Sequence, residues 1–131
     1  MLSSIPSHLP NLPIYKKALE IVILSRSISA YLNYDFMNLN SDGSENKHIY
    51  FSGDIVQQSV SLAPEIEKAE KENFPDQKHK HASTLLELTN RLYKSCIRLE
   101  YSNSDGKDYL SILRSELKAF RKLQRSWMLN F

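Results

Sequence analysis

Apolar residues recur at intervals of three and four along most of this chain, a spacing typical of helices rather than strands. Near the C-terminus the apolar positions are Leu110, Leu113, Leu117, Phe120, Trp127 and Phe131. The same spacing connects Leu85, Leu88, Leu92, Cys96 and Leu99, and a weaker series connects Ile55, Ser59, Leu62, Ile66 and Ala69. Gln124 is the one polar residue within the C-terminal series. The sequence therefore predicts an all-α fold.

Prolines and a polar loop delimit the first predicted helix. Three prolines among the first thirteen residues predict an extended arm over residues 1–12. The first helix is expected to run from Pro13 to Leu32, because proline is tolerated in the first turn of a helix. Residues 38–46 are rich in Asn, Asp, Ser and Gly and show no periodicity, so we expect a loop there.

The second predicted helix contains a proline. Ser52 or Asp54 can cap its start, and the helix is expected to reach Lys71. Pro64 has no N–H to donate to the carbonyl of Val60 and its ring clashes with that group, so we expect the helix to bend there.

Two further helices complete the chain. Pro75 disfavours helical geometry at the preceding residue, so the third helix is expected over residues 76–100. The last helix should begin at Gly106 or Lys107 and run nearly to the C-terminus. Four helices with short connections predict one domain over residues 13–131, an up-and-down antiparallel four-helix bundle.

The first helix is more apolar than one face of a bundle requires. Residues 19–32, LEIVILSRSISAYL, are apolar on more than one side. A second buried surface would explain this excess, so bundles are expected to associate through this helix. The alternative is that this helix is simply the most buried one of a monomer.

Nothing in the sequence points to secretion, a membrane or a disulfide. No apolar run approaches the roughly 18 residues of a membrane span, and the N-terminus lacks the order of a signal peptide. Cys96 is the single cysteine, which is expected to act as a small buried apolar residue. The sequence therefore predicts a cytoplasmic protein that does not bind membranes.

No arrangement of residues suggests catalysis, a cofactor or a metal. His79 and His81 are two apart and would point away from each other on a helix, so both are expected to be solvated. A solvated acidic face is expected from Glu65, Glu67, Glu70 and Glu72. The three glycines lie in separate connections and cannot form a phosphate-binding loop. We therefore expect a protein that is not an enzyme.

Three segments carry a resemblance to known proteins. LPIYKKALEI (residues 12–21) and SVSLAPEIEKAE (residues 59–70) resemble the four-helix bundle family of ribosomal RNA intervening-sequence proteins. RSWML (residues 125–129), a late tryptophan after a basic stretch, resembles the related accessory variability determinant (Avd) of diversity-generating retroelements. The resemblance implies a pentameric, ring-shaped homo-oligomer that partners a reverse transcriptase and binds RNA or DNA.

The last predicted helix carries a row of basic side chains. At about 100° per residue, five of them fall within roughly 60° of one another. These five are Lys107, Arg114, Lys118, Arg121 and Arg125. We call them, together with Lys122 just beside them, the basic stripe. The stripe flanks the apolar seam about 110° around the helix, and it is the candidate nucleic-acid-binding site.

Two explanations of the basic stripe remain open. It can contact phosphates, in which case four or five contacts predict a log-log salt slope of about −3 to −4. It can instead be the solvated side of a helix, or be paired with acidic residues of the second helix, for which the candidates are Glu67, Glu70 and Glu72. The function would then be that of a structural or protein-interaction bundle.

The position of the stripe beside the seam predicts the effect of mutating it. None of its members lies in the apolar series. Replacement of Arg114, Lys118 and Arg121 by glutamine is therefore expected to weaken nucleic-acid binding without disturbing the fold.

Overall fold

The computed structural model describes residues 7–36, 48–101 and 107–131; the side chains of residues 33–36, 48–52 and 107 lie outside this description. Its elements are a short 3-10 helix, η1 (Leu9–Asn11), and the helices α1 (Pro13–Phe36), α2 (His48–Val60), α3 (Leu62–Lys71), α4 (Pro75–Glu100) and α5 (Lys107–Met128). The described ranges contain no strand, which confirms the all-α prediction. None of these helices has the length and apolar content that crossing a membrane requires.

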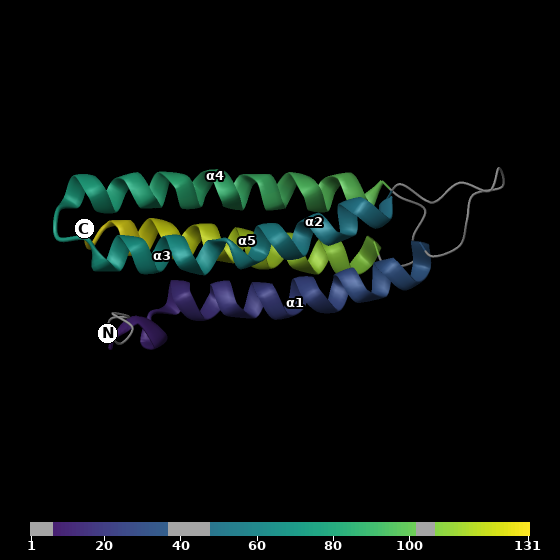
Figure 1. The fold of residues 1–131 in the computed structure, drawn as a ribbon, viewed down its shortest axis with the longest axis horizontal. Coiled ribbons are helices and arrows are strands. Elements are labelled where there is room, and N and C mark those ends of the chain that lie inside the picture. Colours follow the sequence, from purple (N-terminus) through teal and green to yellow (C-terminus); the bar gives the residue numbers. More distant parts are fainter. Residues whose placement is uncertain (1–6, 37–47, 102–106) are drawn as a thin grey trace.

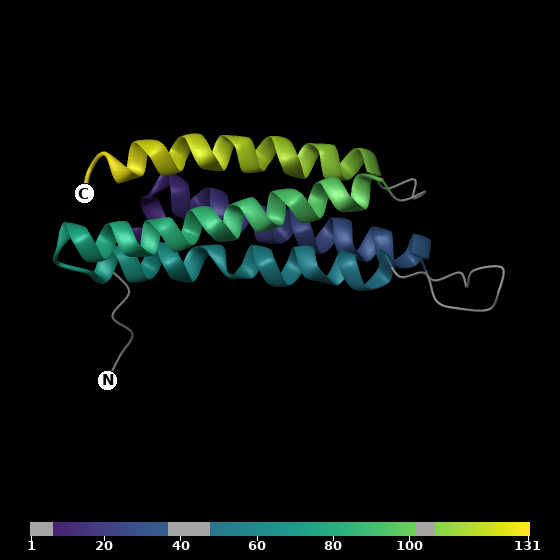
Figure 2. The ribbon, with the colours of Figure 1, turned by 90° about the horizontal axis from the view of Figure 1, so that it is seen from above.

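Helices α2 and α3 run end to end, so the five helices form the four arms of a bundle (Figures 1 and 2). Successive arms run in alternating directions, and α5 packs between α1 and α4. Helix α3 packs chiefly on α4 and lies on the far side of the bundle from α5 (Figure 2). This order decides which charged helices are neighbours.

The boundaries differ from the prediction mainly around the first loop. Helix α1 continues to Phe36 instead of ending at Leu32, and α2 begins at His48, before the expected caps at Ser52 and Asp54. The predicted loop at residues 38–46 falls within the segment 37–47 between these helices, which lies outside the described residues.

The expected bend in the second arm is a full interruption at Ser61. Its backbone N–H donates to the carbonyl of Gln58 at 3.3 Å, a tight turn instead of an α-helical bond. Its hydroxyl donates to the same carbonyl at 2.6 Å. Pro64, three residues later, cannot donate to the carbonyl of Val60, so the chain restarts as a separate helix at Leu62.

The N-terminal segment is not extended where the structure describes it. Residues 9–11 form the one-turn helix η1, in which the N–H of Leu12 donates to the carbonyl of Leu9 at 3.1 Å. The side chain of Leu9 is fully buried in the core. The prediction of an arm missed this turn because prolines dominate the segment.

The predicted apolar series form the core. Ile55, Leu85, Leu92, Cys96, Leu110, Leu117 and Phe120 are all fully buried. Trp127 is 6% exposed and packs edge-on against Phe131, as expected of a core residue. Burial raises the pKa of the Cys96 thiol to about 12, so Cys96 is an inert apolar residue at neutral pH.

Helix α1 is not buried on every side. Ile21 and Leu32 are fully buried, whereas Leu19 is 45% exposed and Ile23 is 66% exposed. Part of the excess of apolar residues therefore lies on the surface of the isolated chain.

Candidate nucleic-acid interface

The basic stripe lies on the side of α5 that turns toward α4. The side chain of Lys107 falls outside the described part. Arg114 and Arg121 are half-buried, whereas Lys118, Lys122 and Arg125 are exposed. The stripe therefore divides into two groups with different surroundings.

Arg114 is held by Glu100 at the end of α4. Its Nε lies 2.6 Å from Glu100 Oε2, and its Nη2 donates to Glu100 Oε1 at 2.9 Å. Its Nη1 also donates to the hydroxyl of Tyr93 at 3.4 Å. The hydrogen bond to Glu100 raises the pKa of the guanidinium above its usual value, so Arg114 is charged at neutral pH.

Arg121 is held by two other side chains of α4. Its Nη2 donates to Asn90 Oδ1 at 2.7 Å, and its guanidinium carbon lies 4.5 Å from the centre of the Tyr93 ring. A guanidinium over an aromatic ring is a favourable cation–π contact. Arg114 and Arg121 thus connect α5 with α4, so we expect their replacement to lower the stability of the bundle.

We predict that Arg114→Gln lowers the free energy of unfolding by about 1–2 kcal/mol, because Glu100 loses its ionic partner and the hydrogen bond from Nη2 in a largely buried position. The side chain of Glu100 is only 20% exposed. Lys118→Gln, one turn away at an exposed position, should change stability by no more than about 0.5 kcal/mol. Urea unfolding of both variants measures the difference, and equal midpoints would show that the pair contributes nothing.

The other three members of the stripe have no partner in the described structure. Lys118, Lys122 and Arg125 make no hydrogen bond or ion pair with any side chain within residues 7–32, 53–101 and 108–131. They are the part of the stripe that is open to a ligand.

The acidic residues of α3 do not neutralise the stripe. Glu67 accepts a hydrogen bond from the hydroxyl of Tyr15 at 3.1 Å. Glu70 accepts one from the indole N–H of Trp127 at 2.8 Å and contacts His8. Glu72 lies 3.7 Å from His81. The alternative that Glu67, Glu70 or Glu72 pairs with the stripe is therefore wrong; Glu100 of α4 pairs with one member.

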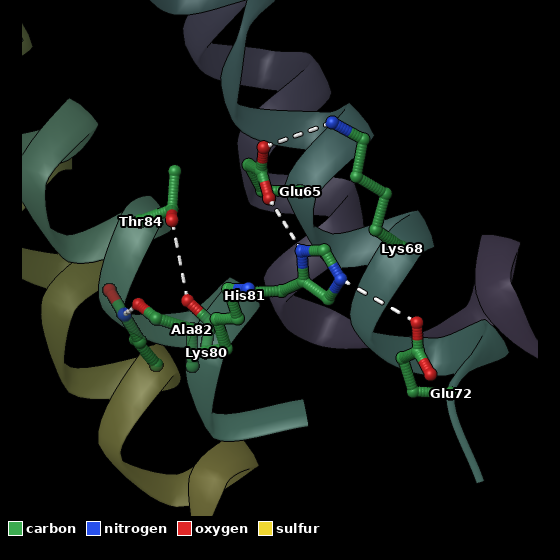
Figure 3. Close-up of polar contacts among 8 residues, drawn as sticks. Glu65, Lys68, Glu72, Lys80, His81, Ala82 and Thr84 are labelled. Carbon is green, nitrogen blue, oxygen red and sulfur yellow. Dashed lines mark hydrogen bonds and ion pairs between the residues drawn. The ribbon is translucent and has the colours of Figure 1, made fainter. Parts of the chain in front are cut away.

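The expected solvated acidic face, and the expected solvation of His81, are also wrong. Glu65 is only 9% exposed. Its carboxylate lies 3.1 Å from His81 Nδ1 and accepts from Lys68 at 3.2 Å (Figure 3). The tight connection between α3 and α4 brings His81 against the acidic helix, a contact that helical spacing alone could not reveal. His79 is exposed, as predicted.

Glu70 connects stability to acid pH. Burial of this carboxyl opposes its charge, but hydrogen bonds with His8 and Trp127 outweigh burial and lower its pKa. A carboxyl whose pKa is lowered by folding stabilises the folded state at pH values above its ordinary pKa of about 4.3. This stabilisation is lost as the pH falls below that value.

We therefore predict that wild-type stability falls with acid more steeply than that of Glu70→Gln, which has no carboxyl to protonate. Trp127 is the single tryptophan and donates directly to Glu70, so its fluorescence in urea titrations between about pH 5 and 3 reports the effect. Parallel pH profiles for the two proteins would contradict it.

Helix α4 adds cations that the sequence analysis missed. Arg91 and Lys94 are exposed on its outer side, and Arg98 follows at the same helical spacing. Helix α4 has five Lys or Arg residues against three Asp or Glu, and α5 has six against two. The helical spacing of the cations in RLYKSCIR (residues 91–98) could have indicated them from the sequence. Only the packing of the helices shows that α4 and α5 are neighbours. The adjacent pair is strongly basic in a chain of net charge +2.

The fold and the charges together define an all-α bundle with one cationic side. Among the described residues, no group of three or more His, Cys, Asp or Glu side chains is placed to hold a metal ion. Searches of protein-family models, curated proteins and solved structures found no significant match to this chain.

Proposed function

We propose that this protein is a non-enzymatic nucleic-acid-binding bundle whose helix α5 contacts phosphates. The observation that supports this most is the state of Lys118, Lys122 and Arg125, which are exposed and unpaired in the described structure. Two of the carboxylates that might have neutralised them, Glu67 and Glu70, instead accept hydrogen bonds from Tyr15 and Trp127. Arg91 and Lys94 extend the cationic side onto α4.

Binding of this kind is sensitive to salt and tolerant of sequence, because its free energy comes from counterion release. Three contacts per protomer correspond to a log-log salt slope of about −3 for duplex DNA and about −2 for single strands. Titration of the wild-type protein with labelled RNA and DNA at several salt concentrations tests the proposal. A slope near zero, or no binding at low salt, would overturn it.

We also propose that the protein assembles into a homo-oligomeric ring, a pentamer by resemblance, through an apolar face shared by α1 and α5. On α1 this face includes Leu19 and Ile23, and on α5 it includes Tyr109 and Ile112, which are 46% and 51% exposed. An apolar cavity of about 270 Å³ lies between the same helices, lined by Leu24, Ser27, Ile28, Tyr31 and Tyr109. Exposed apolar side chains on two neighbouring helices favour an interaction surface there.

A reverse transcriptase is the proposed protein partner, and this part rests on the resemblance of residues 12–21, 59–70 and 125–129 alone. A neighbouring gene that encodes a reverse transcriptase, together with co-purification of the two proteins, would support it. Failure of the co-expressed proteins to associate would count against it.

The second candidate is a protein-interaction bundle without a nucleic-acid role, which the apolar face of α1 and α5 favours on its own. The two candidates differ in one result. Assembly without retention on heparin at moderate salt would favour the second candidate.

A further inference from the structure

A cavity of about 380 Å³ lies at the end of the groove between α4 and α5, lined by Ile97, Glu100, Tyr101 and Arg114. Its volume falls within the roughly 300–1,000 Å³ of small-ligand sites. Tyr101, the residue that follows α4, is 83% exposed. Its ring is therefore accessible from solvent where it lines the cavity.

The side chains around this cavity match the chemistry of a nucleobase. A base has two flat aromatic faces, and an exposed tyrosine ring can stack on one of them. Its edge carries hydrogen-bond donors and acceptors. Glu100 has carboxylate lone pairs beyond those that Arg114 occupies, and Arg114 has guanidinium N–H groups beyond those that meet Glu100 and Tyr93. Ile97 supplies an apolar wall.

The cavity is continuous with the basic stripe. Arg114 belongs to both, and the exposed Lys118 follows one turn later, about 6 Å along the helix axis. A strand whose base enters the cavity would therefore have phosphates close to Lys118. A base paired within a duplex could not enter, because its edge and faces are already covered.

We propose that this cavity holds one unpaired base of a bound nucleic-acid strand, stacked on Tyr101, while Lys118 contacts a neighbouring phosphate. The inference rests on the proposed nucleic-acid-binding function and specifies its ligand as unpaired RNA or DNA. It predicts tighter binding of a single strand than of a closed duplex at equal salt.

The test compares Tyr101→Ala with Tyr101→Phe and with Phe74→Ala, a control that removes another exposed aromatic side chain, 68% exposed at the opposite end of α4. Fluorescence anisotropy measures the affinity of each protein for an unstructured RNA oligonucleotide, the matching DNA oligonucleotide and a hairpin-closed duplex. Tyr101→Ala should weaken single-strand binding about tenfold, the effect of losing one stacked base. The other two variants should bind like the wild type. Duplex affinity and the salt slope should not change.

The outcomes separate this inference from the proposed function. If Tyr101→Ala binds a single strand as tightly as the wild type and with the same salt slope, the base site is overturned and phosphate binding stands. Equal losses for single strands and duplex would also overturn the base site. No salt-dependent binding by the wild-type protein would overturn both proposals. If a nucleoside monophosphate competes at the same concentration as an unlabelled oligonucleotide, the ligand is a free nucleotide and the strand assignment is overturned. The comparison of RNA and DNA of one sequence shows whether the sugar affects binding.

Discussion

Replacement of Lys118, Lys122 and Arg125 together by glutamine is expected to lower nucleic-acid affinity by about 100- to 1,000-fold at roughly 0.1 M salt. The estimate follows from the loss of three phosphate contacts per protomer, each of which adds nearly one unit to the salt slope. All three side chains are exposed and make no ion pair within the described structure, so the variant should keep wild-type stability. Salt titrations of the variant and the wild type on one RNA measure both the affinity and the slope.

The matched control removes the same charge elsewhere. Lys16, Lys71 and Lys80 are also exposed and unpaired among the described residues, and they lie on α1, α3 and the start of α4. A Lys16→Gln, Lys71→Gln and Lys80→Gln variant should lose little affinity and keep most of the wild-type slope. Equal losses in the two triple variants would mean that net charge, and not the basic stripe, governs binding.

A single charge on the apolar face is expected to dissociate the assembly. Ile23 is 66% exposed in the isolated chain, so Ile23→Asp should leave the fold intact, whereas an unpaired carboxylate within a subunit interface is heavily penalised. Light scattering should show a multiple of 15.2 kDa for the wild type and 15.2 kDa for Ile23→Asp. Circular dichroism should show the same helix content for both.

Leu86→Asp is the control for this experiment. Leu86 is also an exposed apolar residue, 45% exposed, but it lies on α4, which is not part of the proposed face and packs chiefly on α3, α5 and α2. Its replacement should leave the assembly unchanged. A wild-type mass of 15.2 kDa at micromolar concentration would remove the oligomer from the proposal, and an unchanged mass for Ile23→Asp would place the interface elsewhere.

The fold could be predicted largely from apolar spacing, because helical periodicity reports directly which residues face a core. Leu85 and Leu117 are examples, since both were assigned to a seam and both are fully buried. The break at Ser61 was only partly predictable: Pro64 forbids one hydrogen bond, but whether the helix bends or restarts depends on the turn that Ser61 makes with Gln58.

The candidate site could be predicted less well, because pairing between helices leaves no trace in helical spacing. A wheel places Arg114 and Lys118 on the same stripe, yet only one of them meets Glu100. Likewise, nothing in the local sequence brings His81 to Glu65; the connection between α3 and α4 does so. The cations of Arg91 and Lys94 were overlooked because they become part of one surface only after α4 packs beside α5.

Helix α3 has three Glu against two Lys, whereas α4 and α5 together have eleven Lys or Arg against five Asp or Glu. This uneven distribution of charge between the sides of the bundle acts as an electric dipole. A net charge of +2 attracts a polyanion only weakly, but a dipole experiences a torque in its field. Within about a Debye length, roughly 8–10 Å, this torque would turn α5 toward the strand before contact. A variant with net charge zero but the same distribution of charge should therefore still approach a strand with α5 turned toward it.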